Sequence, residues 1–141
     1  MQLDKRENGS PIGFRLDGGS GVPPYLQLVQ QVEQALRLGY LVPGDRLPRV
    51  KDVVNDLAIN PNTVLKAYRE LEHKGLVAGR PGLGTFVIGT LTVVPVGDLQ
   101  RLRRRLDRWL QDAVAAGLDE DAINALLAHS IRDLDRAEVA S

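Results

Sequence analysis

The sequence predicts a mainly α-helical fold that includes one small β-hairpin, and three observations support this prediction. Apolar residues recur at helical spacing in several stretches, and proline, asparagine or glycine marks the ends of these stretches. Two short runs typical of strands flank the turn at residues 81–84, which contains two glycines. The length of 141 residues suits one small domain with an appendage.

The most informative segment of the chain begins with a capped helix. Asn60 is a favourable N-cap residue, and Pro61 falls at the first helical position, where its missing N–H has no cost. One face of the helix is apolar and is expected to be buried: Val64, Ala67, Tyr68 and Leu71. The opposite face carries polar side chains with long reach: Asn62, Lys66 and Arg69.

A β-hairpin is expected directly after this helix, which Gly75 ends. Its strands are predicted at Leu76–Arg80 and Thr85–Ile88, joined by the turn at residues 81–84. A winged helix-turn-helix presents to DNA a helix face with long polar side chains and, beside it, a basic hairpin. The sequence therefore predicts this fold for residues 22–88.

Two further helices are expected before this segment. Pro23 and Pro24 open the first, and its apolar face is formed by Tyr25, Val29, Val32 and Leu36, with a stop at Gly39. A type II turn at residues 42–45 follows, because proline and glycine occupy its central positions. The second helix is predicted at Val50–Leu57, and residues 58–60 form the short turn of a helix-turn-helix.

Residues 1–21 form an N-terminal arm that is rich in glycine and serine. We expect its first dozen residues to be disordered and residues 14–16 to form a short strand. A linker is expected at residues 89–97, between the winged domain and the C-terminal tail.

The tail, residues 98–136, is expected to form two amphipathic helices. The first has an apolar seam at spacings of three and four, formed by Leu99, Leu102, Leu106, Trp109 and Ala113. Gly117 breaks it, and Asp119 can cap the second helix. Two short helices cannot bury such stripes against each other alone, so they need either the winged domain or a second copy of the tail. The expected dimer contacts are Leu102, Leu106, Trp109, Leu110, Ile123, Leu127 and Ile131.

Composition and charge exclude several classes of function. The chain has no cysteine and two histidines, so we expect no metal site, no cofactor and no disulfide. It lacks the H-E-x-x-H and serine-elbow motifs, which argues against an enzyme. Residues 46–85 carry seven basic and four acidic side chains, whereas residues 98–141 carry seven and nine, so the positive charge lies on the winged domain. With no membrane span or secretion signal, we expect a cytoplasmic protein.

Residues 24–87 resemble the DNA-binding domain of the GntR family of bacterial transcription regulators. The resemblance is carried by the stretches PPYLQLVQQVEQAL, GYLVPGDRLPRVKDVVNDLAINPNTVLKAYRELEHKGLV and GLGTFV. The entry FRLDGGSGVPPY, the NPNTV start of the third helix and the short tail resemble the YtrA-type branch. This resemblance implies a homodimer that forms through the tail helices and represses operons, often ones that encode membrane transporters.

The resemblance also implies which residues contact double-stranded operator DNA. Lys51 matches a basic residue at the start of the second helix, and Arg49 replaces a serine of the family motif. Asn62 and Thr63 lie at the start of the recognition helix, and Gly82 matches the wing-tip glycine. Many members carry arginine at Pro61 and Leu65, so those base contacts do not transfer. From the residues themselves, Asn62 and Lys66 are expected to reach base edges in the major groove, and the N–H groups at the start of this helix are expected to be unpaired and to face a phosphate. Candidates for contacts with the DNA backbone are Arg46, Arg49, Lys51, Lys74 and Arg80. The full expected set is Arg49, Lys51, Asn60, Pro61, Asn62, Thr63, Lys66, Arg69, Arg80 and Gly82.

Several alternatives remain open from the sequence. The polar face of the third helix could be simply solvated, and the basic run Arg101–Arg108 could touch flanking DNA or form a solvated or dimer-rim face. The chain could be a non-specific architectural DNA binder, or a protein-interaction module that has lost DNA binding. A small-molecule effector acting on the tail or the domain junction is a further hypothesis, which the sequence does not identify.

Overall fold

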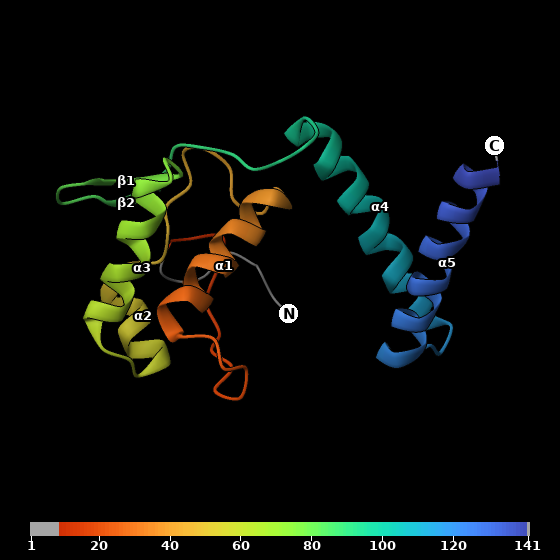
Figure 1. Cartoon of the computed structure of the whole chain (residues 1–141), viewed down its shortest axis with the longest axis horizontal. Helices are drawn as coiled ribbons and strands as arrows, with labels where there is room; N and C mark the ends of the chain where they lie inside the picture. The colour runs from red at the N-terminus through yellow and green to blue at the C-terminus, as the bar shows by residue number, and fades with distance from the viewer. Residues whose placement is uncertain (1–8, 141) are drawn as a thin grey trace. The chain divides into compact units, whose positions relative to one another are not determined.

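The computed structural model describes residues 9–140, with side chains to residue 137, and contains two compact units that divide between Leu99 and Gln100. Figure 1 shows the course of the chain. Its elements are α1 (Pro24–Arg37), α2 (Val50–Leu57), α3 (Pro61–His73), β1 (Val77–Arg80), β2 (Gly84–Val87), α4 (Val96–Ala115) and α5 (Glu120–Ala140). This order confirms the mainly helical fold with one hairpin.

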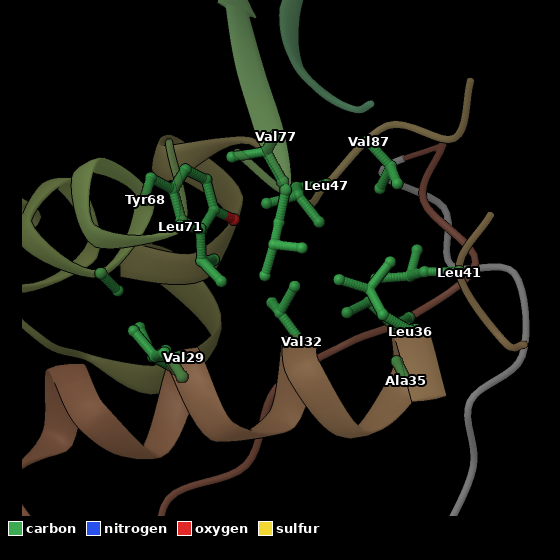
Figure 2. Packing of buried hydrophobic residues seen from close by; sticks show 14 of the residues in the cluster. Val29, Val32, Ala35, Leu36, Leu41, Leu47, Tyr68, Leu71, Val77 and Val87 are labelled. Carbon is green, nitrogen blue, oxygen red and sulfur yellow. The ribbon is translucent and has the colours of Figure 1, made fainter. Parts of the chain in front are cut away.

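The core of the first unit lies between α1, α3 and the hairpin. Figure 2 shows Val29, Val32 and Leu36 pointing from α1 into the core, with Leu36 beside Leu41 of the following loop. The four α3 residues predicted to be buried are all buried, and the inward face of α2 packs against the same cluster. Burial of these apolar side chains removes them from water and fixes α3 against α1.

The hairpin is antiparallel, with Val77 opposite Val87 and Arg80 opposite Gly84. β1 begins one residue later than the predicted Leu76–Arg80 and ends at the same residue, and β2 lies one residue earlier than the predicted Thr85–Ile88. A third segment also pairs with β2: the Leu47 N–H donates to the Thr85 carbonyl at 2.9 Å, and the Val87 N–H donates to the Asp45 carbonyl at 2.8 Å. This third segment joins the hairpin to the loop before α2, an arrangement that completes the winged helix-turn-helix.

The N-terminal arm differs from its prediction. Residues 14–16 form no strand, because the amide of Gln31 on α1 bonds both the N–H and the carbonyl of Arg15, at 3.0 and 2.6 Å. Gln27, one turn earlier, binds the backbone of Asp17 in the same way, at 2.8 and 3.0 Å. Ile12 is fully buried, so the prediction of disorder is wrong for it; the part of that prediction at residues 1–8 lies outside the described residues.

The tail helices are longer than predicted. α4 begins at Val96, inside the expected linker at residues 89–97, and α5 continues to Ala140. The Asp119 side chain accepts a hydrogen bond from the Ala122 N–H at 2.8 Å, which confirms the predicted cap. Within residues 9–140, no helix is both long and apolar enough to cross a membrane.

Candidate nucleic-acid interface

The start of α3 is closed by its own cap. The Asn60 side-chain oxygen accepts from the Asn62 N–H at 2.8 Å, and the Asn60 carbonyl accepts from the Thr63 N–H at 3.0 Å. Pro61 has no N–H. The expectation that unpaired N–H groups are offered to a phosphate here is therefore wrong for residues 61–63. The positive end of the helix dipole remains the contribution of this terminus to anion binding.

The outer face of α3 is cationic and exposed. Asn62, Lys66 and Arg69 are all exposed, on the side opposite the buried residues. A shallow surface groove runs along the second half of α3, lined by Lys66, Arg69, Glu70, His73 and Lys74. Three of these side chains are lysine or arginine and one is glutamate, so the groove favours a polyanion.

Two side chains of α1 hold lysines of α3. The Lys66 ammonium lies 4.0 Å from the centroid of the Tyr25 ring, in a cation–π contact. The Lys74 ammonium pairs with the Glu33 carboxylate at 3.1 Å. Both ammonium groups therefore lie on the side of α3 that faces α1. Lys74, which the sequence suggested for a DNA-backbone contact, already has an acidic partner within the protein.

A buried tyrosine connects α3 to the start of α2. The Tyr68 hydroxyl donates a short hydrogen bond to the Pro48 carbonyl, and the ring packs near Phe14 with centroids 6.5 Å apart. Burial, with a smaller contribution from the charge of Asp52, raises the pKa of the Tyr68 phenol well above its usual range, so the hydroxyl stays protonated. This bond fixes the backbone that leads into Arg49.

The start of α2 presents two exposed cations. Arg49 is the N-cap residue and makes no side-chain cap bond, as expected when arginine replaces the usual serine. Lys51 is exposed in the first turn. Arg49 also lines one groove together with hairpin residues that include Arg80 and Gly82, so the structure brings these three predicted DNA contacts together.

The tip of the hairpin is open to close approach. Gly82 has a φ of 74°, and a side-chain carbon added there would meet nothing within 4 Å. Glycine adopts this left-handed conformation without strain and leaves the backbone uncovered. Arg80 lies over the Phe86 ring at 4.8 Å, which supports the guanidinium beside the tip.

The hairpin is also tied directly to α3. The Glu72 carboxylate accepts a hydrogen bond from the Gly79 N–H at 3.0 Å. This contact spans from the last turn of α3 to the middle of β1, so it couples the orientation of the wing to that of the helix. The sequence reasoning did not include Glu72, because a surface glutamate on a helix carries no signal of its partner.

Nine of the ten predicted DNA contacts are exposed, and Thr63 is half-buried. They fall on three neighbouring parts of the winged unit: the start of α2, α3 and the hairpin. Arg46, also suggested for a backbone contact, turns inward instead: its guanidinium lies where a side chain on Gly9 would be placed.

The tail exposes most of the residues that were predicted to form a dimer. Leu102, Leu106 and Trp109 of α4 are 50%, 44% and 38% exposed, and Ile131 of α5 is 61% exposed. Leu110 and Leu127 are half-buried, and Ile123 is buried. Figure 1 shows α4 and α5 diverging from their connecting loop, and the two helices share few close contacts.

The comparisons with known proteins agree with this geometry. Residues 24–87 match the family model described as "Bacterial regulatory proteins, gntR family". The HTH-type transcriptional repressor YtrA of Bacillus subtilis is 32% identical over 112 residues, which cover 79% of this chain and 86% of that protein. The chain belongs to the GntR family. It is thus a transcriptional regulator of the DNA-binding, winged helix-turn-helix kind.

Further similar proteins extend the match. An HTH-type transcriptional regulator of Mycobacterium tuberculosis, Rv1152, is 45% identical over 74 residues, which cover 52% of this chain and 61% of that protein. Among solved structures, YtrA from Sulfolobus acidocaldarius, a GntR-family transcription factor, aligns with a TM-score of 0.50 and 26% identity over 72% of this chain and 97% of that one. The YtrA-type resemblance therefore includes the tail region as well as the winged domain.

No group of three or more histidine, cysteine, aspartate or glutamate side chains is placed to hold a metal ion in the part of the chain that the structure describes. The relatives are named as transcriptional regulators, which implies DNA binding rather than catalysis. The residues that sequence reasoning missed at this interface are Tyr25, interpreted as core, and Glu72.

Proposed function

We propose that this GntR regulator is a homodimeric repressor that binds a pseudo-palindromic operator. The single observation that carries the proposal is the exposed apolar surface of the tail, formed by Leu102, Leu106 and Trp109 on α4 and Ile131 on α5. Large apolar side chains aligned on one helix face favour burial against a partner. A second copy of the same tail presents the same stripe and can cover it symmetrically.

The dimer gives the winged units a defined spacing. A two-fold axis through the tails would direct two α3 helices to successive major grooves, about 34 Å apart along the DNA. Asn62 would read base edges, since asparagine pairs well with adenine, while Arg49, Lys51 and Arg80 would contact phosphates. The exposure of these side chains and the groove shared by Arg49 with the hairpin support this arrangement.

The direction of regulation is proposed from the relatives. The Bacillus subtilis YtrA is named a repressor, and the match covers most of both chains. The YtrA-type resemblance extends the proposal to the target, an operon that encodes a membrane transporter. A small molecule that binds the dimer and changes the spacing of the α3 helices would relieve repression. Operator affinity that stays constant across the metabolites tested would remove this regulatory element from the proposal.

The oligomeric state tests the proposal directly. Leu106→Asp places a charge in the α4 seam, whereas Gln111→Asp adds the same charge on the opposite, exposed face of the same helix. We expect light scattering to give a dimer for the wild type and for Gln111→Asp, and a monomer for Leu106→Asp. We also expect Leu106→Asp to bind a full operator no better than a half-site. A wild-type monomer that binds both DNAs equally would refute the dimeric mechanism.

A further inference from the structure

A cation that was expected to read bases is held by an aromatic ring. Lys66 lies on the outer face of α3, yet its ammonium lies 4.0 Å from the centroid of the Tyr25 ring. Tyr25 belongs to the first turn of α1 and is half-buried, packed against the hydrophobic core. A ring fixed in this way offers its negative face at a constant position. The Lys66 side chain therefore points toward α1.

A second contact between α1 and α3 holds another lysine. Glu33 follows Tyr25 by eight residues on α1, and Lys74 follows Lys66 by eight residues on α3. Glu33 and Lys74 pair at 3.1 Å. The two contacts therefore lie two turns apart along both helices. They line up the lysines along the groove at the flank of α3, which Arg69 also lines.

The position of a lysine decides what it can contribute to DNA binding. A base contact requires the ammonium to extend into the groove toward a guanine edge. An ammonium held at the flank of the helix is placed instead for the phosphate backbone, where contacts add affinity without reading sequence. Because the ring already restricts the lysine side chain, less conformational entropy is lost when the lysine binds a phosphate.

We propose that Tyr25 is a positioning residue for DNA binding, which holds Lys66 for a phosphate contact and withholds it from base readout. This inference rests on the proposed function, since it requires the α3 face to meet DNA. It assigns Lys66 to affinity and leaves sequence choice to other residues of α3. If Tyr25 served core packing alone, the effect of its substitution on DNA affinity would not depend on the charge of Lys66.

The experiment combines the free protein with a double-mutant cycle. In the free protein, NMR should show the Lys66 ε-methylene protons shifted upfield by the ring in the wild type and in Tyr25→Phe, and unshifted in Tyr25→Leu. Fluorescence anisotropy then measures binding to the DNA upstream of the protein's own gene and to random DNA of equal length. The variants are Tyr25→Phe, Tyr25→Leu, Lys66→Met and the double variant Tyr25→Leu with Lys66→Met. Thermal unfolding sets a temperature at which all variants are folded.

We expect Lys66→Met to lower the affinity for both DNAs by the same factor. It should also reduce the slope of log affinity against log salt by about 0.9, the value for one phosphate contact. Tyr25→Leu should lower the affinity for both DNAs by about two- to five-fold, in line with an exposed cation–π contact. Added to Lys66→Met, the same substitution should lower the affinity no further. Tyr25→Phe, which keeps the ring, should match the wild type.

Two results would overturn the inference while DNA binding stands. If Lys66→Met weakens binding to the upstream DNA but not to random DNA, Lys66 reads bases. If Tyr25→Leu weakens binding equally in the wild type and in Lys66→Met, Tyr25 acts only through packing. A ring shift in a wild type that binds neither DNA would instead reject the proposed function. An absent ring shift would reject the contact itself.

Discussion

Ala58 adopts a left-handed backbone conformation, with a φ of 54°, in the turn between α2 and α3. This conformation costs a residue with a side chain about 1–2 kcal/mol, whereas glycine adopts it freely but loses more entropy on folding. We expect Ala58→Gly to raise the free energy of unfolding by about 0.5–1 kcal/mol. Urea denaturation measures this change. As a control, Gln30→Gly on the exposed face of α1 should lower it by a similar amount.

Tyr68 predicts a distinctive dependence of stability on alkaline pH. Its phenol is buried and its pKa is raised above the ordinary value of about 10. The stabilisation that the protonated phenol gives to the folded state is therefore complete below pH about 10. As the pH rises further, this stabilisation is lost by about 1.4 kcal/mol per pH unit. Tyr68→Phe should cost about 1–3 kcal/mol at neutral pH, because it leaves the Pro48 carbonyl unpaired.

The comparison of the two proteins isolates this effect. Urea denaturation from pH about 8 to about 11 should show the free energies of unfolding of the wild type and Tyr68→Phe converging as the tyrosine ionises in the unfolded state. Parallel curves over this range would mean that the phenol does not lie in the buried, bonded state described here.

The hairpin and α3 are coupled as elements through Glu72. Removing its carboxylate should free the Gly79 N–H, to which it bonds at 3.0 Å. We expect Glu72→Ala to speed exchange of the Gly79 amide hydrogen by about two- to ten-fold, the range for one net hydrogen bond of modest strength. Glu70→Ala removes the same charge from the same helix and should leave this rate unchanged. Equal rates in all three proteins would show that Glu72 does not hold the wing.

The sequence predicts the helices well because their ends carry local chemistry. Asn60 with Pro61, Gly75, Gly117 and Asp119 each act within a few residues, so a pattern of spacing and caps is sufficient. The boundaries that failed depend on distant partners. Residues 14–16 look like a strand, but their backbone bonds are satisfied by glutamine side chains of α1.

The interface is only partly visible in the sequence for the same reason. The exposed residues of α3 follow from helical periodicity, and Gly82 follows from the turn. The contacts of Lys66 with Tyr25 and of Lys74 with Glu33 join residues about 40 positions apart. No local pattern distinguishes such a held lysine from one that is free to extend.

At the scale of the whole molecule, the tail exposes more large apolar side chains than the winged unit does, among them Leu102, Leu106, Trp109 and Ile131. The apolar faces of α4 and α5 are exposed, and the two helices share few close contacts. If a second copy covers them, folding of the tail is linked to protein concentration by mass action. We expect the thermal midpoint to rise with protein concentration in the wild type and in Gln111→Asp. In Leu106→Asp the midpoint should be independent of concentration.

The most direct measurement is binding to the DNA upstream of the protein's own gene by fluorescence anisotropy, at about 150 mM salt because phosphate contacts depend strongly on salt. Random DNA of equal length serves as the competitor. A sequence-specific regulator should hold the upstream DNA about a thousand-fold or more tighter than the random DNA. Displacement of the upstream DNA by an equal amount of random DNA would contradict sequence-specific recognition by α3 and indicate an architectural DNA binder.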